Sequence, residues 1–178
     1  LDGFSQALLE DYADRLDPEG RDYLQRLRRA SQRMAALIDD MLKLARVTSC
    51  ALVLARIDLS DMAREIAAEL KRAGPGRDVA VTIAPGLFAN ADANLMRVAL
   101  ENLLGNAWKF TSKREKAAVE FGAAAGGTDT VYHVRDNGAG FDMKFADKLF
   151  GAFQRLHSAE DYPGDGIGLA SAQRIIHR

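Results

Sequence analysis

Three short segments of this sequence carry residue types that suit a phosphate-rich ligand. The first runs from Asn102 to Thr111 and holds two carboxamides and an ammonium, on Asn102, Asn106 and Lys109. At 3.6 residues per turn these side chains share one stripe of a helix. A carboxamide oxygen is a hard, neutral ligand suited to Mg²⁺, and an ammonium offsets phosphate charge. The segment predicts a site for a metal-bound polyphosphate, although a solvated helix face is the commoner explanation of this spacing alone.

The second segment, residues 136–142, directly follows a predicted strand. Its opening Asp136-Asn137-Gly138 is also typical of a plain tight turn, and that interpretation stays open. A second glycine, Gly140, favours a loop whose backbone approaches a ligand closely. The Asp136 carboxylate could accept a hydrogen bond from the exocyclic amine of a base.

The third segment places Gly164, Gly166 and Gly168 on alternate positions, with Ile167 and Leu169 between and after them, where a helix is expected to begin. Backbone N–H groups and the dipole at a helix start favour an anion, so the segment predicts a phosphate cradle. Alone, this pattern is weak. In this order along the chain, the three segments together are far more specific.

The sequence has two regions with different residue patterns, and the elements they form are expected to position these segments. Apolar residues in the N-terminal region recur with the period of a helix. They predict a short helix over residues 4–16 and a long one after a break at Asp17-Pro18. The long helix carries a heptad seam, which predicts a helical bundle with more than one partner helix. The seam consists of Leu24, Leu27, Ser31, Met34, Ile38, Met41 and Ala45.

The region after residue 56 has a mixed α/β pattern. Strands are expected at 57–59, 79–83, 118–123 and 130–135, the last two joined in a hairpin at Gly126-Gly127. Helices are expected from a Ser60 cap to about Arg72, from Asp92 to about Phe110, and from about Ile167. The core-facing stripe of the middle helix is predicted to be Met96, Ala99, Leu100, Leu103, Ala107 and Phe110.

Composition excludes several classes of protein. Lys+Arg 24 against Asp+Glu 25 leaves a net charge of −1, with no basic excess for a general nucleic-acid binder. Hydrophobic content of 48% is ordinary for a globular chain, and no apolar run approaches the roughly 20 residues that span a bilayer. The single cysteine, Cys50, excludes an internal disulfide framework and favours a reducing compartment, so we expect a cytoplasmic location.

These segments give the chain a resemblance to bacterial two-component sensor histidine kinases of the PAS- and phytochrome-like branch. Residues 102–111 are similar to the N box of that family, 136–140 to its G1 box and 164–169 to its G2 box. Residues 148–157, between the last two, are similar to the F box that opens the ATP lid. Four ordered motifs make the match specific, and it covers nearly the whole chain.

The resemblance implies a role for each matching position. Asn106 would coordinate Mg²⁺ on ATP with Asn102 beside it, Lys109 would contact phosphate, and Arg155 would face the γ-phosphate. The catalytic set is then Asn102, Lys109 and Arg155. The nucleotide would be bound by these residues and by Asn106, Phe110, Asp136, Gly138, Gly140, Gly164, Gly166, Ile167, Gly168 and Leu169.

The resemblance also implies an α+β fold, in which a helical hairpin precedes a Bergerat-type ATP-binding sandwich with a mixed sheet and helices on one face. The hairpin, residues 1–48, would be half of a dimeric four-helix bundle for dimerisation and histidine phosphotransfer. Residues 49–56 would be a linker and 57–178 the catalytic domain. Expected partners are a second copy, a response-regulator receiver domain and an upstream sensor domain, in a parent that could be tethered to a membrane.

The chain departs from the family pattern in three ways. The phosphoacceptor histidine and its flanking motif are absent, and so are the strands expected after the last helix, so we expect a fragment that cannot autophosphorylate. His133, His157 and His177 lie elsewhere in the pattern. Asp165 stands where Thr or Ser is usual, and its carboxylate could face solvent, join the metal shell or weaken nucleotide binding.

Three other functions are compatible with parts of this sequence. Gyrase-like and chaperone ATPases of the same fold carry Glu at the position of Asn102, where a carboxylate can deprotonate water and a carboxamide cannot. An anti-sigma-type serine kinase shares the ATP site but has no need of a long helical hairpin. A nucleotide-binding dimerisation scaffold without kinase activity is the non-enzymatic alternative.

Overall fold

The computed structural model describes residues 2–49, 51–126, 129–158 and 161–178. They form two compact units, Leu1–Ser49 and Cys50–Arg178, and each is described by itself. None of the helices in these ranges is long and apolar enough to cross a membrane.

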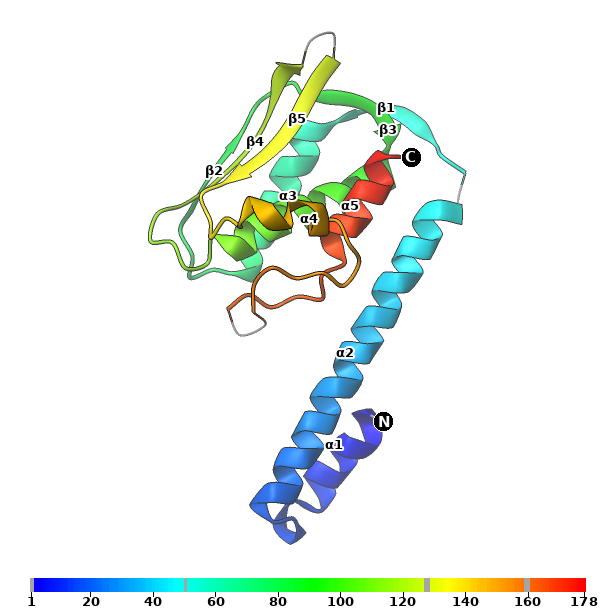
Figure 1. Ribbon diagram of the computed structural model, residues 1–178, viewed down its shortest axis with the longest axis vertical. Coiled ribbons are helices and arrows are strands. Elements are labelled where there is room, and N and C mark those ends of the chain that lie inside the picture. The colour runs from blue at the N-terminus through cyan, green and yellow to red at the C-terminus, as the bar shows by residue number, and fades with distance from the viewer. Residues whose placement is uncertain (1, 50, 127–128, 159–160) are drawn as a thin grey trace. The chain divides into compact units, whose positions relative to one another are not determined.

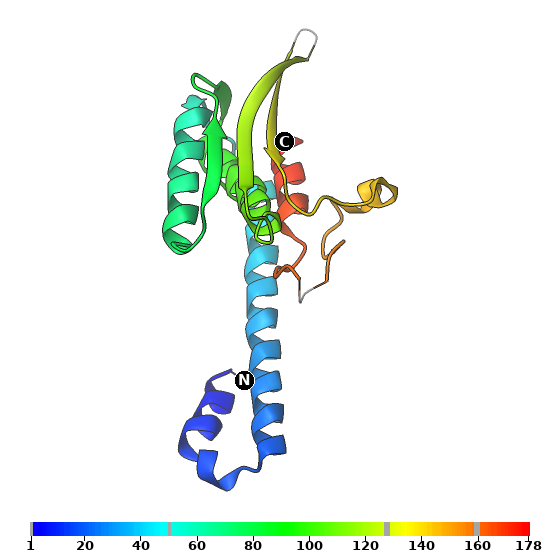
Figure 2. The same ribbon diagram turned by 90° about the vertical axis from the view of Figure 1, so that its left-hand side faces the viewer.

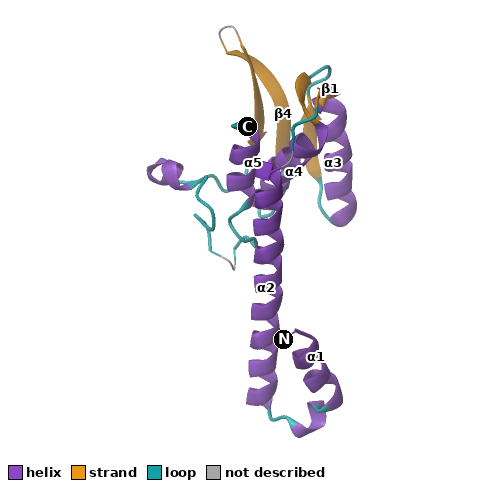
Figure 3. Ribbon diagram, turned by 90° about the vertical axis from the view of Figure 1, so that its right-hand side faces the viewer, coloured by secondary structure: helices purple, strands orange, loops and turns teal. Residues whose placement is uncertain are grey.

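The first unit is a helical hairpin of unequal arms (Figure 3). Helix α1 (Asp2–Asp11) and the short 3-10 helix η1 (Ala13–Arg15) lead into helix α2 (Pro18–Ser49). The predicted break is confirmed, because the Asp17 carboxylate accepts a hydrogen bond from the Gly20 amide (2.7 Å) just after Pro18 opens the helix.

The heptad seam on α2 is largely open to solvent within one chain. Leu27, Met34 and Ile38 are each about half exposed. The side chains of Met41 and Ala45, also assigned to the seam, lie outside the part that the structure describes. A stripe of exposed apolar side chains on a helix is the pattern expected of a bundle surface.

In the residues that the structure describes, the second unit has two sheets and three α-helices, whose arrangement is drawn in Figure 1. Strands β1 (Leu54–Asp58) and β3 (Phe88–Asp92) pair antiparallel. The larger sheet has the order β2-β4-β5, formed by β2 (Val79–Ile83), β4 (Ala117–Gly126) and β5 (Asp129–Asp136). In it β2 and β4 are parallel, with Val79 opposite Ala117, whereas β4 and β5 form the predicted antiparallel hairpin. The residues assigned to a linker, 49–56, therefore include the first part of β1.

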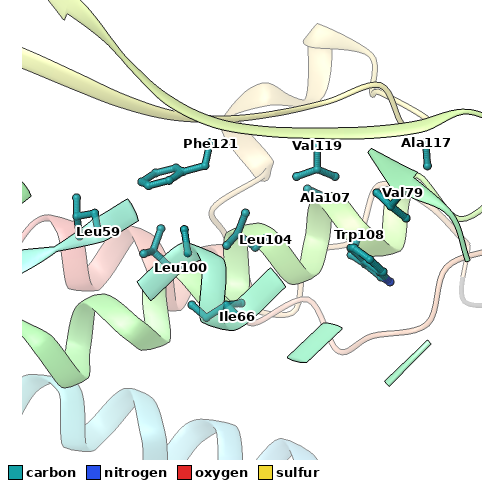
Figure 4. Packing of buried hydrophobic residues seen from close by; sticks show 11 residues of the cluster. Leu59, Ile66, Val79, Leu100, Leu104, Ala107, Trp108, Ala117, Val119 and Phe121 are labelled. Atoms are coloured by element: carbon teal, nitrogen blue, oxygen red, sulfur yellow. The ribbon is translucent and has the colours of Figure 1, made fainter. Parts of the chain in front are cut away.

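The helices α3 (Leu59–Ala73), α4 (Ala93–Phe110) and α5 (Gly168–Ile176) lie on one side of the larger sheet, as expected (Figures 1 and 4). The loop from β5 to α5 carries the 3-10 helix η2 (Met143–Lys148) at its outer end, away from the sheet (Figure 2). This loop contains the residues expected to form the ATP lid.

The core lies between the sheet and helices α3 and α4 (Figure 4). Ala117, Val119 and Phe121 of β4 point inward on alternate positions, as a half-buried strand requires. They face apolar side chains from β2, α3 and α4: Val79, Leu59, Ala63, Ile66, Leu100, Leu104, Ala107 and Trp108.

Two details of the helices differ from prediction. The core stripe of α4 includes Leu104 and Trp108, whereas Leu103 and Phe110 are only partly buried. The N-cap of α3 is Asp58, which accepts a hydrogen bond from the Asp61 amide (2.9 Å), and not Ser60. Ser60 is buried instead, because its hydroxyl donates to Ala84 O (2.7 Å) and accepts from Leu87 N (2.9 Å) across the turn between β2 and β3.

Candidate functional site

Helix α4 carries the first predicted motif and is held firmly at its start. The Asp92 carboxylate caps the helix by accepting from the amides of Asn94 (3.0 Å) and Leu95 (3.2 Å). It also accepts from Val53 N, and these backbone hydrogen bonds lower the pKa of Asp92. One turn later Arg97 binds carboxylates of α3 and α4, on Glu65, Glu69 and Glu101. The helix is therefore fixed before it reaches the motif.

The C-terminal end of α4 packs directly on the second motif. Ala139 N donates to Phe110 O (3.1 Å), and a Cβ atom at Gly138 would lie only 2.7 Å from the carbonyl carbon and oxygen of Phe110. Asp136 folds back so that its Oδ1 accepts from Gly138 N (2.8 Å), which is the tight-turn geometry. Close approach and a turn thus coexist in this loop.

Lys109 lies against the third motif, at Gly164. Its Nζ lies 3.0 Å from where a Cβ atom of Gly164 would stand. Arg155 approaches the same loop, donating through Nη1 to Gly164 O (2.6 Å) and through Nη2 to Tyr162 O (2.7 Å). Two cations predicted to bind phosphate therefore lie at one glycine loop.

Asn102 marks the third contact between α4 and a glycine loop. Its Nδ2 donates to Val98 O (2.8 Å), and its Oδ1 lies 2.5 Å from the position that a Cβ of Gly168 would take. Only glycine allows the start of α5 to come this close. The neighbouring Ile167 is 3% exposed, so its side chain packs into the fold and only its backbone could face a ligand.

Asn106 lies on α4 between Asn102 and Lys109 and is half-buried. Its carboxamide has no hydrogen bond to any residue that the structure describes, which leaves it available to a ligand. In the described ranges no three His, Cys, Asp or Glu side chains cluster as a metal site would require. The Asn106 oxygen is a hard, neutral donor of the kind that Mg²⁺ accepts.

An aromatic cluster that sequence reasoning missed lies beside Phe110. The ring centroids of Phe110, His157 and Tyr162 lie 5.2 to 5.4 Å from one another.

Polar contacts accompany this ring cluster. His157 Nε2 donates to Gly140 O (2.9 Å), and Lys113 pairs with Asp161 beside the Tyr162 ring. These contacts join the lid to α4 and to the second motif. The Tyr162-Pro163-Gly164 sequence was a possible signal, but nothing in it indicates the partner ring.

The backbone of the glycine loops depends on positive φ angles. Gly140 (64°), Gly164 (142°) and Gly166 (74°) adopt them. Phe153 also has a positive φ, of 63°, and its amide donates to Gly166 O (3.0 Å). The predicted F box and the third motif are therefore joined by their backbones.

The electrostatics of the site centre on Lys109. Burial lowers its pKa, the nearby Arg155 lowers it further, and Asp165 acts in the opposite direction. Asp165 is itself half-buried. The site thus holds a partly desolvated Lys109 ammonium beside the exposed Arg155, with one carboxylate as counter-charge, an arrangement that favours a polyanionic ligand.

Replacing Lys109 by methionine should stabilise the fold while weakening the binding of a polyphosphate. Because burial depresses the pKa of Lys109, the folded chain keeps it protonated only at a cost in stability, present in full below the depressed pKa and relieved as pH rises through it. We expect Lys109→Met to raise the melting temperature near neutral pH, by less in alkaline buffer, and to weaken the binding of a polyphosphate about tenfold. Calorimetry and thermal unfolding measure both. The exposed Lys71→Met is the control, and equal effects of the two variants would contradict the prediction.

Two family models match successive parts of the chain. Residues 1–50 match the His Kinase A (phospho-acceptor) domain. Residues 91–178 match the family described as histidine kinase-, DNA gyrase B-, and HSP90-like ATPase. The second match contains all three glycine and asparagine motifs.

Individual relatives agree with these families. The chain is 31% identical to cyanobacterial phytochrome A of Nostoc sp. over 97% of its own length and 22% of that protein. It is 30% identical to the methanogenesis regulatory histidine kinase FilI of Methanothrix harundinacea, over 99% of its own length and 20% of FilI. It thus spans about a fifth of these curated relatives.

A solved structure extends the agreement to three dimensions. Full-length ShkA in complex with AMPPNP superposes with a TM-score of 0.63 at 29% identity, over 90% of this chain and 34% of ShkA. With both domain families matched in this order, the chain belongs to the two-component sensor histidine kinases.

Proposed function

We propose that this chain binds Mg-ATP between helix α4 and the two glycine loops, and that within its parent protein it phosphorylates a histidine of the helical bundle. The observation that carries the proposal is that one helix meets both loops, through Gly138 against Phe110, Gly164 against Lys109 and Gly168 against Asn102. An ATP-binding domain family matches these residues, and a relative of known structure binds an ATP analogue.

The proposed roles follow from chemistry and position. Asn106 would hold Mg²⁺ together with the phosphates, and the ion would neutralise the charge that develops on the transferred group. Lys109 would bind phosphate, and Arg155 would stabilise the γ-phosphoryl group through the N–H donors that its two lid carbonyls leave free. The Asp136 carboxylate would accept from the adenine amine.

The phosphoryl acceptor would be a histidine outside this chain. His133 lies in β5 against Glu120, His157 contacts Gly140, and His177 caps α5, so none of the three is on the hairpin. The phosphoryl group would then pass to an Asp of a response-regulator receiver domain. Such transfer depends mainly on positioning, so presentation of the ATP domain to the bundle would set its rate.

A second copy of the chain is the proposed partner of the hairpin. Leu27, Met34 and Ile38 expose the heptad seam of α2, and burial of such a seam against a symmetric partner would complete a four-helix bundle. The match to a phospho-acceptor domain supports dimerisation.

The alternatives are less favoured by particular residues. Direct ATP hydrolysis would need a carboxylate near Asn102, but Glu101 binds Arg97 (3.0 Å) on another side of α4. A serine kinase of the anti-sigma type would not need the helical hairpin, which matches the phospho-acceptor family. A nucleotide-binding scaffold without kinase activity would share the cations at Gly164, and the similarity to a relative described as a histidine kinase favours the kinase over it.

Calorimetric titration of this chain with ATP tests the proposal. We expect ATP to bind in MgCl₂ and to bind much more weakly in EDTA. In Asn106→Ala the affinity for Mg-ATP should fall about tenfold, because the variant lacks a metal ligand. Asn94→Ala, on an exposed turn of the same helix, is the matched control. Absence of nucleotide binding by the wild-type chain, or equal Mg²⁺ dependence in both variants, would sink the proposal.

A further inference from the structure

The last turn of α4 carries Lys109 and Phe110, so the site depends on how that turn ends. A helix leaves its last four carbonyls without partners inside the helix, and a buried end needs other donors. Thr111 provides two such donors, because its amide and its hydroxyl both donate to the carbonyl of Ala107 (3.2 and 2.8 Å). Ser112 N donates to Lys109 O (3.0 Å), and Ala139 N of the G1 loop donates to Phe110 O.

The fourth carbonyl, of Trp108, accepts from the Thr111 hydroxyl (3.0 Å) and also from a residue outside every motif. Arg77 donates through Nη1 to Trp108 O (2.7 Å) and through Nη2 to Thr111 Oγ1 (3.2 Å). Its guanidinium also lies over the Trp108 indole, 5.4 Å from the ring centroid. Arg77 comes from the loop between α3 and β2, and Thr111 is fully buried. A cation at a helix C-terminus is favoured by the helix dipole, and its fork-shaped donors fit two acceptors.

The turn that Arg77 holds is the one on which the G1 loop rests. Phe110 O accepts a hydrogen bond from Ala139 N. Gly138 lies so close to the Phe110 carbonyl group that a Cβ atom would not fit between them. Arg114 closes the far side, donating through Nη2 to Gly138 O (2.8 Å). A shift of this turn would therefore displace Lys109, Phe110 and the G1 loop together.

We propose that Arg77 is a positioning residue of the nucleotide site: by binding Trp108 O and Thr111 Oγ1 it fixes the α4 turn that presents Lys109 and Phe110 and seats the G1 loop. This inference rests on the proposed ATP site for its functional consequence, but the holding of the turn is a property of the chain without nucleotide. Among the described residues Arg77 makes no hydrogen bond or ion pair with the glycine loops or with Asn106, so its effect would act through α4.

The test compares Arg77→Gln with Arg77→Lys and with Arg97→Gln. Arg97 also ties α4 to its surroundings, but at the opposite end of the helix, so Arg97→Gln removes a guanidinium with several partners on α3 and α4 without disturbing the last turn. We expect Arg77→Gln to weaken ATP binding at least about fivefold, Arg77→Lys to recover part of the loss, and Arg97→Gln to stay within about twofold of wild type.

Two measurements without nucleotide separate this inference from the proposed function. Trp108 is the single tryptophan of the chain, so its emission reports the Arg77 contact. Hydrogen exchange of the Ala139 amide reports the bond to Phe110 O. We expect both to change in Arg77→Gln and not in Arg97→Gln. If wild type fails to bind ATP, the proposed function falls while these readouts still decide whether Arg77 holds the turn. Unchanged emission and exchange in Arg77→Gln, or an equal effect of both variants, would overturn the inference.

Discussion

Replacing Gly138 by alanine is expected to remove nearly all nucleotide binding and to destabilise the ATP-binding unit. The added Cβ would stand 2.7 Å from the Phe110 carbonyl carbon and oxygen and 2.6 Å from Asp136 Oδ1. Two of these three atoms are backbone of the last helical turn, which cannot yield as a flexible side chain would. Overpacking of this kind costs about 1–3 kcal/mol. The loop would have to move away from α4, and displacement of a binding loop by about 1 Å can cost a factor of about 100.

The control for this substitution is Gly76→Ala. Gly76 lies in the loop before β2, and a Cβ atom there would meet no heavy atom within 4 Å. We expect Gly76→Ala to bind ATP as wild type does and to melt within a few degrees of it. Calorimetric titration with Mg-ATP and thermal unfolding of both variants give the comparison. A Gly138→Ala protein that binds ATP within threefold of wild type would show that the G1 loop does not depend on its contact with Phe110.

The sequence predicted best those elements whose signals are local. Asp92 before a helical period predicted the start of α4, and its carboxylate does cap the helix. Strand β3 was missed. It contains Phe88 but then Ala89, Asn90 and Ala91, none of them β-branched, so propensity does not favour a strand there. It forms because it pairs with β1, from Ile57 opposite Ala89 to Leu54 opposite Asp92, and such pairing leaves no trace in a short window.

The misplaced cap of α3 has a similar cause. Ser60 and Asp58 are both good capping residues, and the pattern alone does not separate them. The choice is made by the turn between β2 and β3, where Ala84 O and Leu87 N need partners and the buried Ser60 hydroxyl supplies both. Asp58 is then left to cap the helix. A local rule thus gave the right helix, and a contact 24 residues away in the chain decided its first residue.

The site divides in the same way. The glycine and asparagine motifs were found because each is a compact string of residues, and the structure brings them to one helix. Arg77, His157 and Tyr162 were missed because their importance lies in contacts with residues far away in sequence. Arg77 reaches Trp108 O across 31 positions, and His157 reaches Gly140 O across 17. Nothing in the residues around them indicates these partners.

Replacing Asp165 by threonine is expected to strengthen ATP binding by on the order of 10- to 100-fold at low ionic strength. Asp165 is half-buried, and its charge raises the pKa of Lys109 against the effects of burial and of Arg155. It therefore acts as a counter-charge for a cation that we propose binds phosphate. A phosphate that approaches Lys109 must do so beside this carboxylate, and like charges about 5 Å apart repel by about 3 kcal/mol at an effective dielectric of about 20. Salt screening reduces the penalty, so the gain should shrink as ionic strength rises.

Asp165→Asn is the matched variant, because it removes the charge and nearly keeps the shape. If repulsion is the cause, Asp165→Asn and Asp165→Thr should both bind ATP more tightly, both gains should fall with added salt, and the binding of uncharged adenosine should not change. If the threonine hydroxyl matters instead, only Asp165→Thr would gain. Calorimetric titrations with ATP and adenosine at two salt concentrations distinguish these cases. Weaker Mg-ATP binding in both variants would contradict the prediction, since it would mean that the Asp165 carboxylate helps to hold the metal and not that it opposes the phosphate.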